Sequence, residues 1–280
     1  MKFKVGIAQI SPKLGDLDFN LLKHFEYVEK AKEEKVDLLI FPELSLTGYF
    51  LQDLSREIAL RLDDPNLEGL KRASREISLV VGLAEKSDGF PYISALYLEG
   101  GEVVHVHRKV YLPTHGMFED GKYFARGSNI RAFDSRFGRA GLLICRDSWH
   151  LSSGYILAQD GAKFLILINA SPVRGVKGDV PDPDPMLKKL FSVYAYYLNL
   201  YLFFAHRVGC EDGLCFYGGS AIFNPLGQVE VSAPYFHEAL ITATIDPEIW
   251  QRKNSLIPLR RDEDLEMVSR EIERIKNGRK

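Results

Sequence analysis

Short apolar runs alternate with amphipathic segments in the first half of the chain. Residues 3–10 and 36–41 are predicted strands, and the second ends in Leu38-Leu39-Ile40-Phe41, which has no polar position. An entirely apolar strand is typical of a sheet covered on both faces. Residues 20–35, between these strands, carry apolar side chains at helical spacing, which predicts an amphipathic helix.

The elements that follow are predicted by the same patterns. A helix is expected at 66–77, and Glu99-Gly100-Gly101 is a hairpin signal between two strands. The predicted strands of this region are 78–84, 92–98, 102–108 and 139–144. The first half therefore runs strand, helix, strand, helix and then mostly strands.

The second half has the same order of elements, although no residue-level repeat is visible. We expect helices at 153–160 and 185–199, separated by an apolar strand at 163–169. Four further strands are predicted at 201–207, 220–223, 228–231 and 239–245. Two such halves can pack sheet against sheet with their helices outside. The sequence thus predicts an α/β fold, a four-layer α-β-β-α sandwich of two mixed sheets, with residues 134–138 as a joint inside the fold.

The segment at 171–185 interrupts this regular order. It is rich in Pro, Gly and Asp and is predicted to form a loop over the strand ends, where substrates bind in such sheets. Its residues Asp179, Asp182 and Asp184 indicate either a cationic or polar substrate or simply a solvated acidic loop.

The C-terminal tail has a different character from the rest of the chain. An amphipathic helix pattern at 262–275 predicts either a solvated cap or a subunit contact. We therefore divide the chain into one large domain at 1–257 and a tail at 258–280.

Composition and charge exclude several classes of function. The chain has 280 residues, of which 46% are hydrophobic and 26% charged, so it can bury a sizeable core. Its formal net charge of −2 gives no electrostatic reason to expect nucleic acid or an anionic membrane as a partner. No apolar stretch approaches the ~20 residues that span a bilayer.

The N-terminus enters a strand pattern directly, so we expect no signal peptide. Three cysteines are too few for a disulfide framework and indicate a reducing compartment, the cytoplasm.

Three predicted strands end in chemically reactive side chains. Cys145 closes the apolar run 141–144, Glu43 follows Phe41-Pro42, and Lys109 follows the strand at 102–108. An apolar strand that ends abruptly in polar residues delivers its last side chain to a cleft. A carboxylate at such a strand end must be paired or functional, because burying it alone is costly. A thiol, a carboxylate and an ammonium at three strand ends would form a catalytic set.

Other residues suggest different chemistry. His105 and His107 share one face of a strand and could chelate a metal, but no cysteine or carboxylate accompanies them at ligand spacing, which favours a packed or solvated strand face. His150 is near enough to Cys145 for a Cys–His pair of the kind found in cysteine proteases. Cys210 and Cys215 have no companion pair, and we assign them no special role.

The surroundings of these three residues resemble the nitrilase superfamily of carbon–nitrogen hydrolases over nearly the whole chain. Glu43 lies in Phe-Pro-Glu-Leu-Ser-Leu-Thr-Gly-Tyr, Lys109 in Arg-Lys-Val-Tyr-Leu-Pro, and Cys145 in Gly-Leu-Leu-Ile-Cys-Arg-Asp. These segments are similar to the glutamate, lysine and cysteine motifs of the family and occur in the same order. The segment from Tyr217 to Pro225 also fits the family pattern. The resemblance implies that Glu43, Lys109 and Cys145 form a catalytic triad.

The acidic residues that follow the lysine motif depart from the family pattern. The family often has Asp-Glu before a stretch ending in Arg-Tyr-Phe, with that glutamate near the catalytic lysine. Here Glu119-Asp120 precede Gly121-Lys122-Tyr123-Phe124, so the acidic order is reversed. The fourth carboxylate is therefore Glu119 or Asp120, and we take Glu119 as the catalytic candidate.

The resemblance also bears on the substrate. Arg146 and Asp147 follow Cys145 where true nitrilases have Trp-Glu, which argues against a nitrile. The segment 169–172 resembles the glutamine-amidase domains of glutamine-dependent NAD synthetases, and this implies that Ser171 and Lys177 touch the substrate. His115 stands where those domains commonly have Tyr, which weighs against glutamine. The sequence has no Ser-Gly-Gly ATP loop, so we do not expect a complete NAD synthetase.

The implied reaction is hydrolysis of a non-peptide C–N bond in a small amide, without a metal or an organic cofactor. Glu43 would take the thiol proton, Cys145 would attack the amide carbon, and Lys109 with the backbone N–H of Arg146 would stabilise the oxyanion before a thioester is hydrolysed. Lys109 should lower the pKa of the thiol while Glu43 opposes that shift, so we expect a reactive sulfur or direct proton transfer to Glu43. Tyr49 and Trp149 are expected to line the pocket.

Several alternatives stay open at this point. Nitrile hydrolysis, N-carbamoyl hydrolysis and acyl transfer to an amine use the same machinery, and a non-catalytic scaffold relative would keep the fold alone. The resemblance further implies a homodimer or larger assembly in which the tail from Pro258 reaches across the interface.

Overall fold

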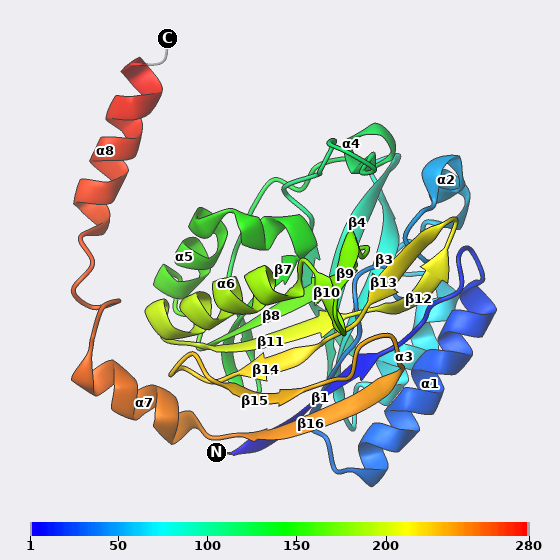
Figure 1. Ribbon diagram of the computed structural model, residues 1–280, viewed down its shortest axis with the longest axis horizontal. Helices are drawn as coiled ribbons and strands as arrows, with labels where there is room; N and C mark the ends of the chain where they lie inside the picture. The colour runs from blue at the N-terminus through cyan, green and yellow to red at the C-terminus, as the bar shows by residue number, and fades with distance from the viewer. Residues whose placement is uncertain (1, 279–280) are drawn as a thin grey trace.

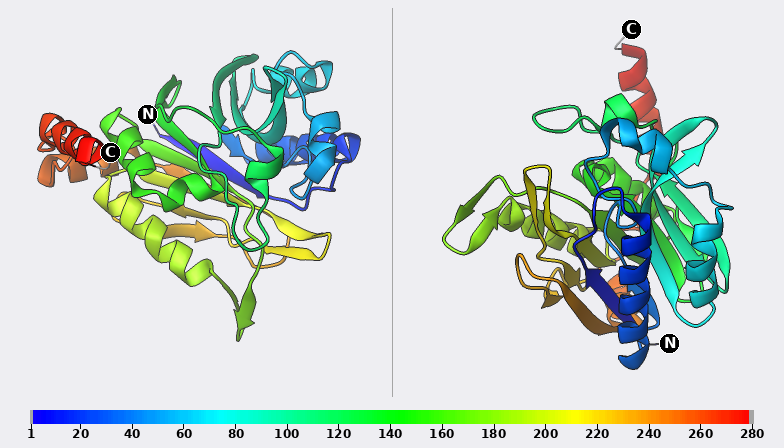
Figure 2. Two further views of the ribbon diagram at one scale, coloured as in Figure 1. Left: turned by 90° about the horizontal axis from the view of Figure 1, so that it is seen from above. Right: turned by 90° about the vertical axis from the view of Figure 1, so that its right-hand side faces the viewer.

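Two six-stranded sheets lie face to face, and helices cover their outer faces (Figure 1, Figure 2). The computed structural model describes residues 2–278. The predicted four-layer α-β-β-α sandwich of two mixed sheets is confirmed.

The first sheet comes almost entirely from the first half of the chain. Its strand order is β16-β1-β2-β3-β4-β5. The bounds are β1 Phe3–Gln9, β2 Leu38–Ile40, β3 Ser78–Ser87, β4 Phe90–Glu99, β5 Glu102–Arg108 and β16 Ala239–Ile245. Strands β1, β2 and β3 pair in parallel, whereas β4, β5 and β16 join antiparallel.

The second sheet repeats this arrangement with the order β15-β14-β11-β8-β7-β6. The bounds are β6 Phe133–Ser135, β7 Gly138–Ile144, β8 Phe164–Asn169, β11 Tyr201–His206, β14 Ala221–Phe223 and β15 Val229–Ser232. Strands β7, β8 and β11 are parallel and the others antiparallel. The expected joint at 134–138 is the tight connection between β6 and β7, inside one sheet.

Alternating side chains along the strands produce three apolar layers. On β7, Leu142 and Ile144 pack between the two sheets, whereas Leu143 packs in the layer under the outer helices. The main covering helices are α1 (Leu17–Glu33) and α3 (Glu68–Ala73) on the first sheet and α5 (Leu151–Gln159) and α6 (Asp184–Tyr197) on the second. The shorter helices are η1 (Gln52–Leu54), α2 (Ser55–Ile58), η2 (Pro65–Leu67), α4 (Asp120–Tyr123) and η3 (Cys145–Trp149).

Two small hairpins were not predicted from the sequence, and one of them lies in the segment expected to be a loop. The segment at 171–185 contains β9 (Gly175–Lys177) paired with β10 (Val180–Asp182). A second hairpin pairs β12 (Val208–Glu211) with β13 (Leu214–Tyr217). Its turn residues Asp212 and Gly213 have φ of 45° and 79°, as a two-residue hairpin turn requires. The Asp-Gly pair was therefore a usable signal for this hairpin.

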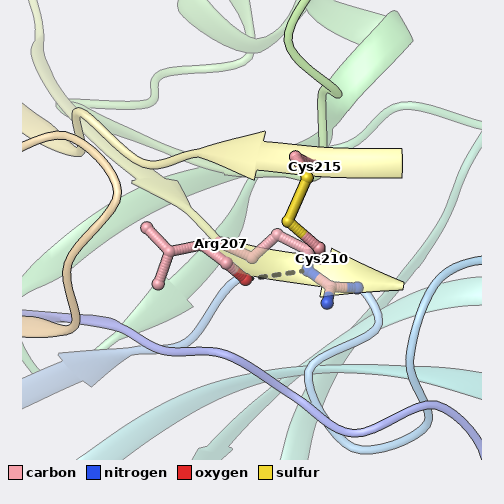
Figure 3. The surroundings of a disulfide bond; sticks show 4 residues. Arg207, Cys210 and Cys215 are labelled. Atoms are coloured by element: carbon pink, nitrogen blue, oxygen red, sulfur yellow. Dashed lines mark hydrogen bonds between the residues drawn. A yellow bond between two sulfur atoms is a disulfide. The ribbon is translucent and has the colours of Figure 1, made fainter. Parts of the chain in front are cut away.

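A disulfide joins the strands of the second hairpin, which corrects the expectation for its cysteines (Figure 3). Cys210 and Cys215 are directly opposed in the β12–β13 register, with Cα atoms 4.1 Å apart. The cysteine count alone could not reveal this pair, because the pairing depends on the hairpin register. The expectation of a reducing compartment rested on the cysteine count alone, and it stays a prediction.

The C-terminal tail extends away from the sandwich. Helix α7 (Pro247–Leu256), which was not predicted from the sequence, follows β16 directly. The expected tail helix is α8 (Leu265–Gly278), which projects from the body in Figure 1 and has no buried residue. It does not cap the sheet, and its role as a subunit contact stays a prediction. Within residues 2–278, no helix has the length and apolar character needed to cross a membrane.

Candidate active site

Two buried charges meet at the ends of β2 and β5. Glu43 lies just after β2 and Lys109 just after β5, and both side chains are fully buried. The Lys109 Nζ lies 2.7 Å from Glu43 Oε1. The turn that carries Glu43 passes so close to β3 that a Cβ at Gly82 would lie 2.5 Å from the backbone N of Leu44. Glycine at 82 therefore permits the approach that turns the carboxylate inward.

Asp120 is the second carboxylate on this lysine. Its Oδ2 lies 2.8 Å from Lys109 Nζ, and its Oδ1 accepts a hydrogen bond from Tyr49 Oη at 3.1 Å. Glu119, which we took as the catalytic candidate, is exposed and lies 3.7 Å from Lys122 Nζ. The physical reason is that α4 begins at Asp120, so this single turn directs Asp120 inward and Glu119 outward. Asp120 therefore replaces Glu119 as the fourth residue of the site.

Cys145 is the first residue of η3, directly after β7, and its backbone is strained. Its φ is 44°, in the left-handed region that costs a non-glycine residue about 1–3 kcal/mol. Ser148 Oγ donates to the Cys145 carbonyl at 2.8 Å, which holds the turn in place. Backbone strain of this kind clusters at active sites. The amide of Arg146 lies in the first turn of η3, where backbone N–H groups have no intrahelical acceptor.

The charges around Cys145 determine its protonation. Burial, and then the negative charge of Glu43, raise the pKa of the Cys145 thiol to about 12 although Lys109 opposes the shift. Burial raises the pKa of Glu43 to about 7 against the attraction of Lys109. Burial alone would lower the pKa of Lys109. The negative charges of Asp120 and Glu43 outweigh this effect and raise the pKa well above the usual value. The resting sulfur is therefore a thiol, so of the two options left open by the sequence this electrostatics favours direct proton transfer to Glu43.

Proton transfer to Glu43 is the alternative that fits this electrostatics. Glu43 Oε2 is buried and has no hydrogen-bond partner among residues 2–278, so it is available to accept a proton. A general base works best with a pKa near the working pH, and Glu43 meets that condition. Lys109 uses two of its three N–H groups on carboxylates, which leaves one for a substrate oxygen.

A cavity of about 270 Å³ gives access to the sulfur. Three of the residues expected to bind substrate line it together with Cys145, and these are Arg146, Trp149 and Ser171. Ser171 Oγ lies 3.9 Å from the sulfur. Lys177 is exposed on β9 and is not among the described residues that line this cavity. Tyr49 lies behind the site, against Asp120, and does not line the Cys145 cavity.

The alternative roles of the histidines do not arise in this arrangement. The His150 ring stacks on Tyr111 with centroids 3.5 Å apart and does not line the Cys145 cavity. His150 and Cys145 therefore do not form a Cys–His pair. His107 Nε2 lies 2.8 Å from Asp147 Oδ2, whereas the His105 ring stacks on Phe133 at 4.3 Å. The two rings that could have chelated a metal are thus engaged with different partners.

Comparison with known proteins identifies the family. Residues 4–254 match the sequence model of the family described as Carbon-nitrogen hydrolase. The chain belongs to this family.

Relatives of this carbon–nitrogen hydrolase include longer proteins. It is 32% identical over 247 residues to the glutamine-dependent NAD(+) synthetase of Acinetobacter baylyi, a match that covers 88% of this chain and 44% of the synthetase. The chain thus spans less than half the length of that relative. A carbon-nitrogen hydrolase from Helicobacter pylori G27 superposes with a TM-score of 0.83 at 23% identity, over 95% of this chain and 96% of the other. An amidase from Nesterenkonia sp. superposes with a TM-score of 0.79 at 23% identity, over 96% and 95%. These two structures support the fold.

Sequence reasoning missed the role of Asp147 in the hydrolase. Its Oδ1 accepts the backbone N–H groups of Val110 and Tyr111 at 3.0 and 2.9 Å. Its Oδ2 accepts the N–H of Ile144 at 3.2 Å and faces His107. One buried carboxylate therefore ties the chain after Lys109 to the turn that carries Cys145. Asp147 is the last residue of the cysteine motif and was visible in the sequence, but its hydrogen-bond partners were not.

His206 was also missed, and it positions Ser171. Its Nε2 accepts the Ser171 N–H at 2.8 Å, and its Nδ1 donates to the Gly218 carbonyl at 2.7 Å. Burial lowers the pKa of His206 to about 3, so the ring is neutral and this tautomer satisfies both contacts. Asn169 Nδ2 donates to Ser171 Oγ at 2.9 Å, which orients the hydroxyl beside the sulfur.

The disulfide hairpin supports the site from behind. Glu211 Oε1 accepts the N–H groups of Tyr49 and Phe50, each at 2.8 Å. Its Oε2 pairs at 2.9 Å with Arg207, a fully buried guanidinium that lies beside the hairpin (Figure 3). The adjacent Cys210–Cys215 bond holds the strands that carry Glu211. Tyr49, and through it Asp120, is therefore positioned by this hairpin.

Proposed function

We propose that this protein hydrolyses the C–N bond of a small amide through a Cys145 thioester. One observation carries the proposal, the buried Glu43–Lys109–Asp120 cluster whose charges act on a sulfur that lines an open cavity. Amide hydrolysis needs a nucleophile, a proton carrier and a donor for the oxyanion, and these residues supply one of each.

The first half of the reaction forms the thioester. Glu43 Oε2 takes the thiol proton as Cys145 Sγ attacks the carbonyl carbon. The oxyanion is stabilised by the remaining N–H of Lys109 and by the backbone N–H of Arg146. Losing one such donor typically costs ~100–1000-fold in rate. Glu43 then returns the proton to the departing nitrogen, and ammonia or an amine leaves as the C–N bond breaks.

The second half releases the acid. A water molecule gives its proton to Glu43 as its oxygen attacks the thioester carbon, and the same donors stabilise the second oxyanion. The C–S bond breaks, the sulfur recovers the proton from Glu43, and the carboxylic acid departs. Asp120 keeps Lys109 charged and fixed throughout, because it remains ionically paired with the ammonium.

The acidic loop supplies little of the substrate preference expected from its sequence. Asp184 is buried and bonded to Tyr235 Oη at 2.6 Å and Lys188 Nζ at 3.0 Å. Asp182 is the one aspartate of the three that lines the Cys145 cavity, within the described part of the chain. A cationic substrate is therefore not favoured by this loop.

The test is ammonia release from a panel of amides, nitriles and N-carbamoyl amino acids, with glutamine included. We expect release from amides by the wild-type protein and none by Cys145→Ala, with circular dichroism showing that the variant folds. Release from nitriles or carbamoyl compounds alone would identify a different bond in the same machinery. Undiminished activity in Cys145→Ala would overturn the thioester, and a folded wild type without activity on any compound would favour a scaffold protein.

A further inference from the structure

A second cavity adjoins the catalytic one. It has a volume of about 300 Å³ and is lined by residues that include Tyr111, Thr114, Arg126 and His150. Three residues line both cavities, and these are Pro113, His115 and Arg146. A substrate that reaches Cys145 can therefore extend past Arg146 into the second cavity.

The charge of this second cavity is positive. Arg126 and Arg146 line it, and no carboxylate does so among the described residues. Neither guanidinium forms an ion pair within residues 2–278, whereas the neighbouring Arg108 is paired with Glu85 at 2.6 Å. Asp147, the acidic residue next to Arg146, is fully buried and engaged with backbone N–H groups. Both positive charges are thus left for a ligand.

Each of the two guanidinium groups lies over an aromatic ring. The Arg126 guanidinium carbon lies 5.4 Å from the ring centroid of Tyr111, and that of Arg146 lies 5.2 Å from the ring centroid of Trp149. A cation–π contact occupies no hydrogen-bond acceptor, and neither guanidinium donates a hydrogen bond within residues 2–278, so the N–H groups of both are free for a ligand. Planar N–H pairs match the two oxygens of a carboxylate or phosphate.

We propose that this Arg126–Arg146 cavity binds an oxyanion, so that the substrate is an amide with a carboxylate or phosphate at its far end. This inference rests on the proposed amidase function and adds the class of substrate. Asp182 is the opposing charge in the catalytic cavity, where Arg174 also lines the wall, so the joined cavities carry more arginine than carboxylate. The anion binds at the arginine edges while the amide carbon lies at Cys145.

The experiment compares matched amides of equal chain length. One set ends in a carboxylate, a second in a phosphate ester and a third in an uncharged hydroxyl, with two to five carbons as the spacer. The proteins are the wild type, Arg126→Gln and Arg146→Gln. Arg270→Gln removes the same charge from helix α8, which projects from the body (Figure 1) and contributes no described residue to the lining of either cavity, and it is the matched control. The readout is the ratio of kcat/KM for the anionic amide to kcat/KM for the hydroxyl amide.

We expect the wild type to favour one anionic set by at least tenfold, with the preferred set distinguishing carboxylate from phosphate. A charge-assisted hydrogen bond contributes enough that each arginine variant should reduce this ratio about 10- to 100-fold, mainly through KM. Arg270→Gln should keep the wild-type ratio. A ratio near one in the wild type, or an unchanged ratio in both cavity variants, would overturn the oxyanion site and leave the amidase proposal intact.

A binding measurement separates the two proposals. Calorimetry on Cys145→Ala measures affinity for the same amides without turnover. One outcome would keep the oxyanion site while the amidase proposal fails. In that outcome the wild type hydrolyses no amide, but Cys145→Ala binds the anionic set more tightly than the hydroxyl set. Adding Arg126→Gln to Cys145→Ala then removes this difference in affinity. Equal affinity for all three sets would overturn the oxyanion site by itself.

Discussion

Replacing Asp120 with Asn tests the electrostatics of the site most fully. Asp120 and Glu43 both contact one tetrahedral ammonium, so their oxygens lie about 4.5 Å apart. Two charges at that distance repel by about 4 kcal/mol at an effective dielectric near 20, or about 3 pK units at most. The negative charge of Asp120 raises the pKa of Glu43, so its removal lowers that pKa, while the larger effect of burial remains. We expect the acid limb of kcat/KM to move down by about one pH unit or more, and the plateau to fall about 10- to 100-fold because Lys109 is held less firmly.

The matched control is Glu119→Gln, which removes the same charge from the adjacent residue. Glu119 is exposed, so its variant should keep the wild-type pH profile and a plateau within about twofold. The assay is ammonia release at low substrate concentration across a pH series, with circular dichroism on each variant. Equal small losses in both variants, with the acid limb unmoved, would refute the role assigned to Asp120.

Three other predictions follow from the same contacts. The wild-type kcat/KM should rise with pH through an apparent pKa near 7 and then level off, because Glu43 must be ionised to accept the thiol proton; a flat profile through that range would contradict the assignment of Glu43 as the base. The thiolate absorbance of Cys145 should not develop until well above pH 9, since burial and Glu43 raise the pKa of the thiol to about 12; a thiolate signal at neutral pH, missing in Cys145→Ala, would show that Lys109 dominates instead. Replacing both Cys210 and Cys215 with Ser should lower the free energy of unfolding by about 2 kcal/mol in urea, as expected for a short closed loop; identical denaturation midpoints for the oxidised wild type and the double variant would contradict this.

The layers of the fold could be predicted because burial leaves a direct mark on the sequence. A strand such as β7, buried on both faces, must be apolar along its length, and its alternate residues serve two different cores. The hairpin β12–β13 was missed because its strands are short and irregular in pattern, although Asp212-Gly213 marked the turn. The disulfide depends on the register of that hairpin, which no count of cysteines contains.

The sequence predicts those residues of the site that lie at strand ends. Glu43 and Lys109 follow strands of one sheet and Cys145 follows a strand of the other, so the packing of the two sheets brings these three strand ends to one site. Asp120 could not be chosen over Glu119, because the choice depends on the phase of a single helical turn. The raised pKa of the thiol also lay beyond the sequence, since burial, its largest cause, is a property of the folded chain.

The central claim is that Cys145 becomes acylated during turnover. The direct measurement is intact-protein mass spectrometry after rapid acid quenching with an amide that the protein hydrolyses, followed by peptide mapping. We predict a mass increase equal to the acyl group, located on Cys145 and absent from Cys145→Ala. Steady turnover with no acyl adduct at any quench time, together with activity retained by Cys145→Ala, would contradict the account.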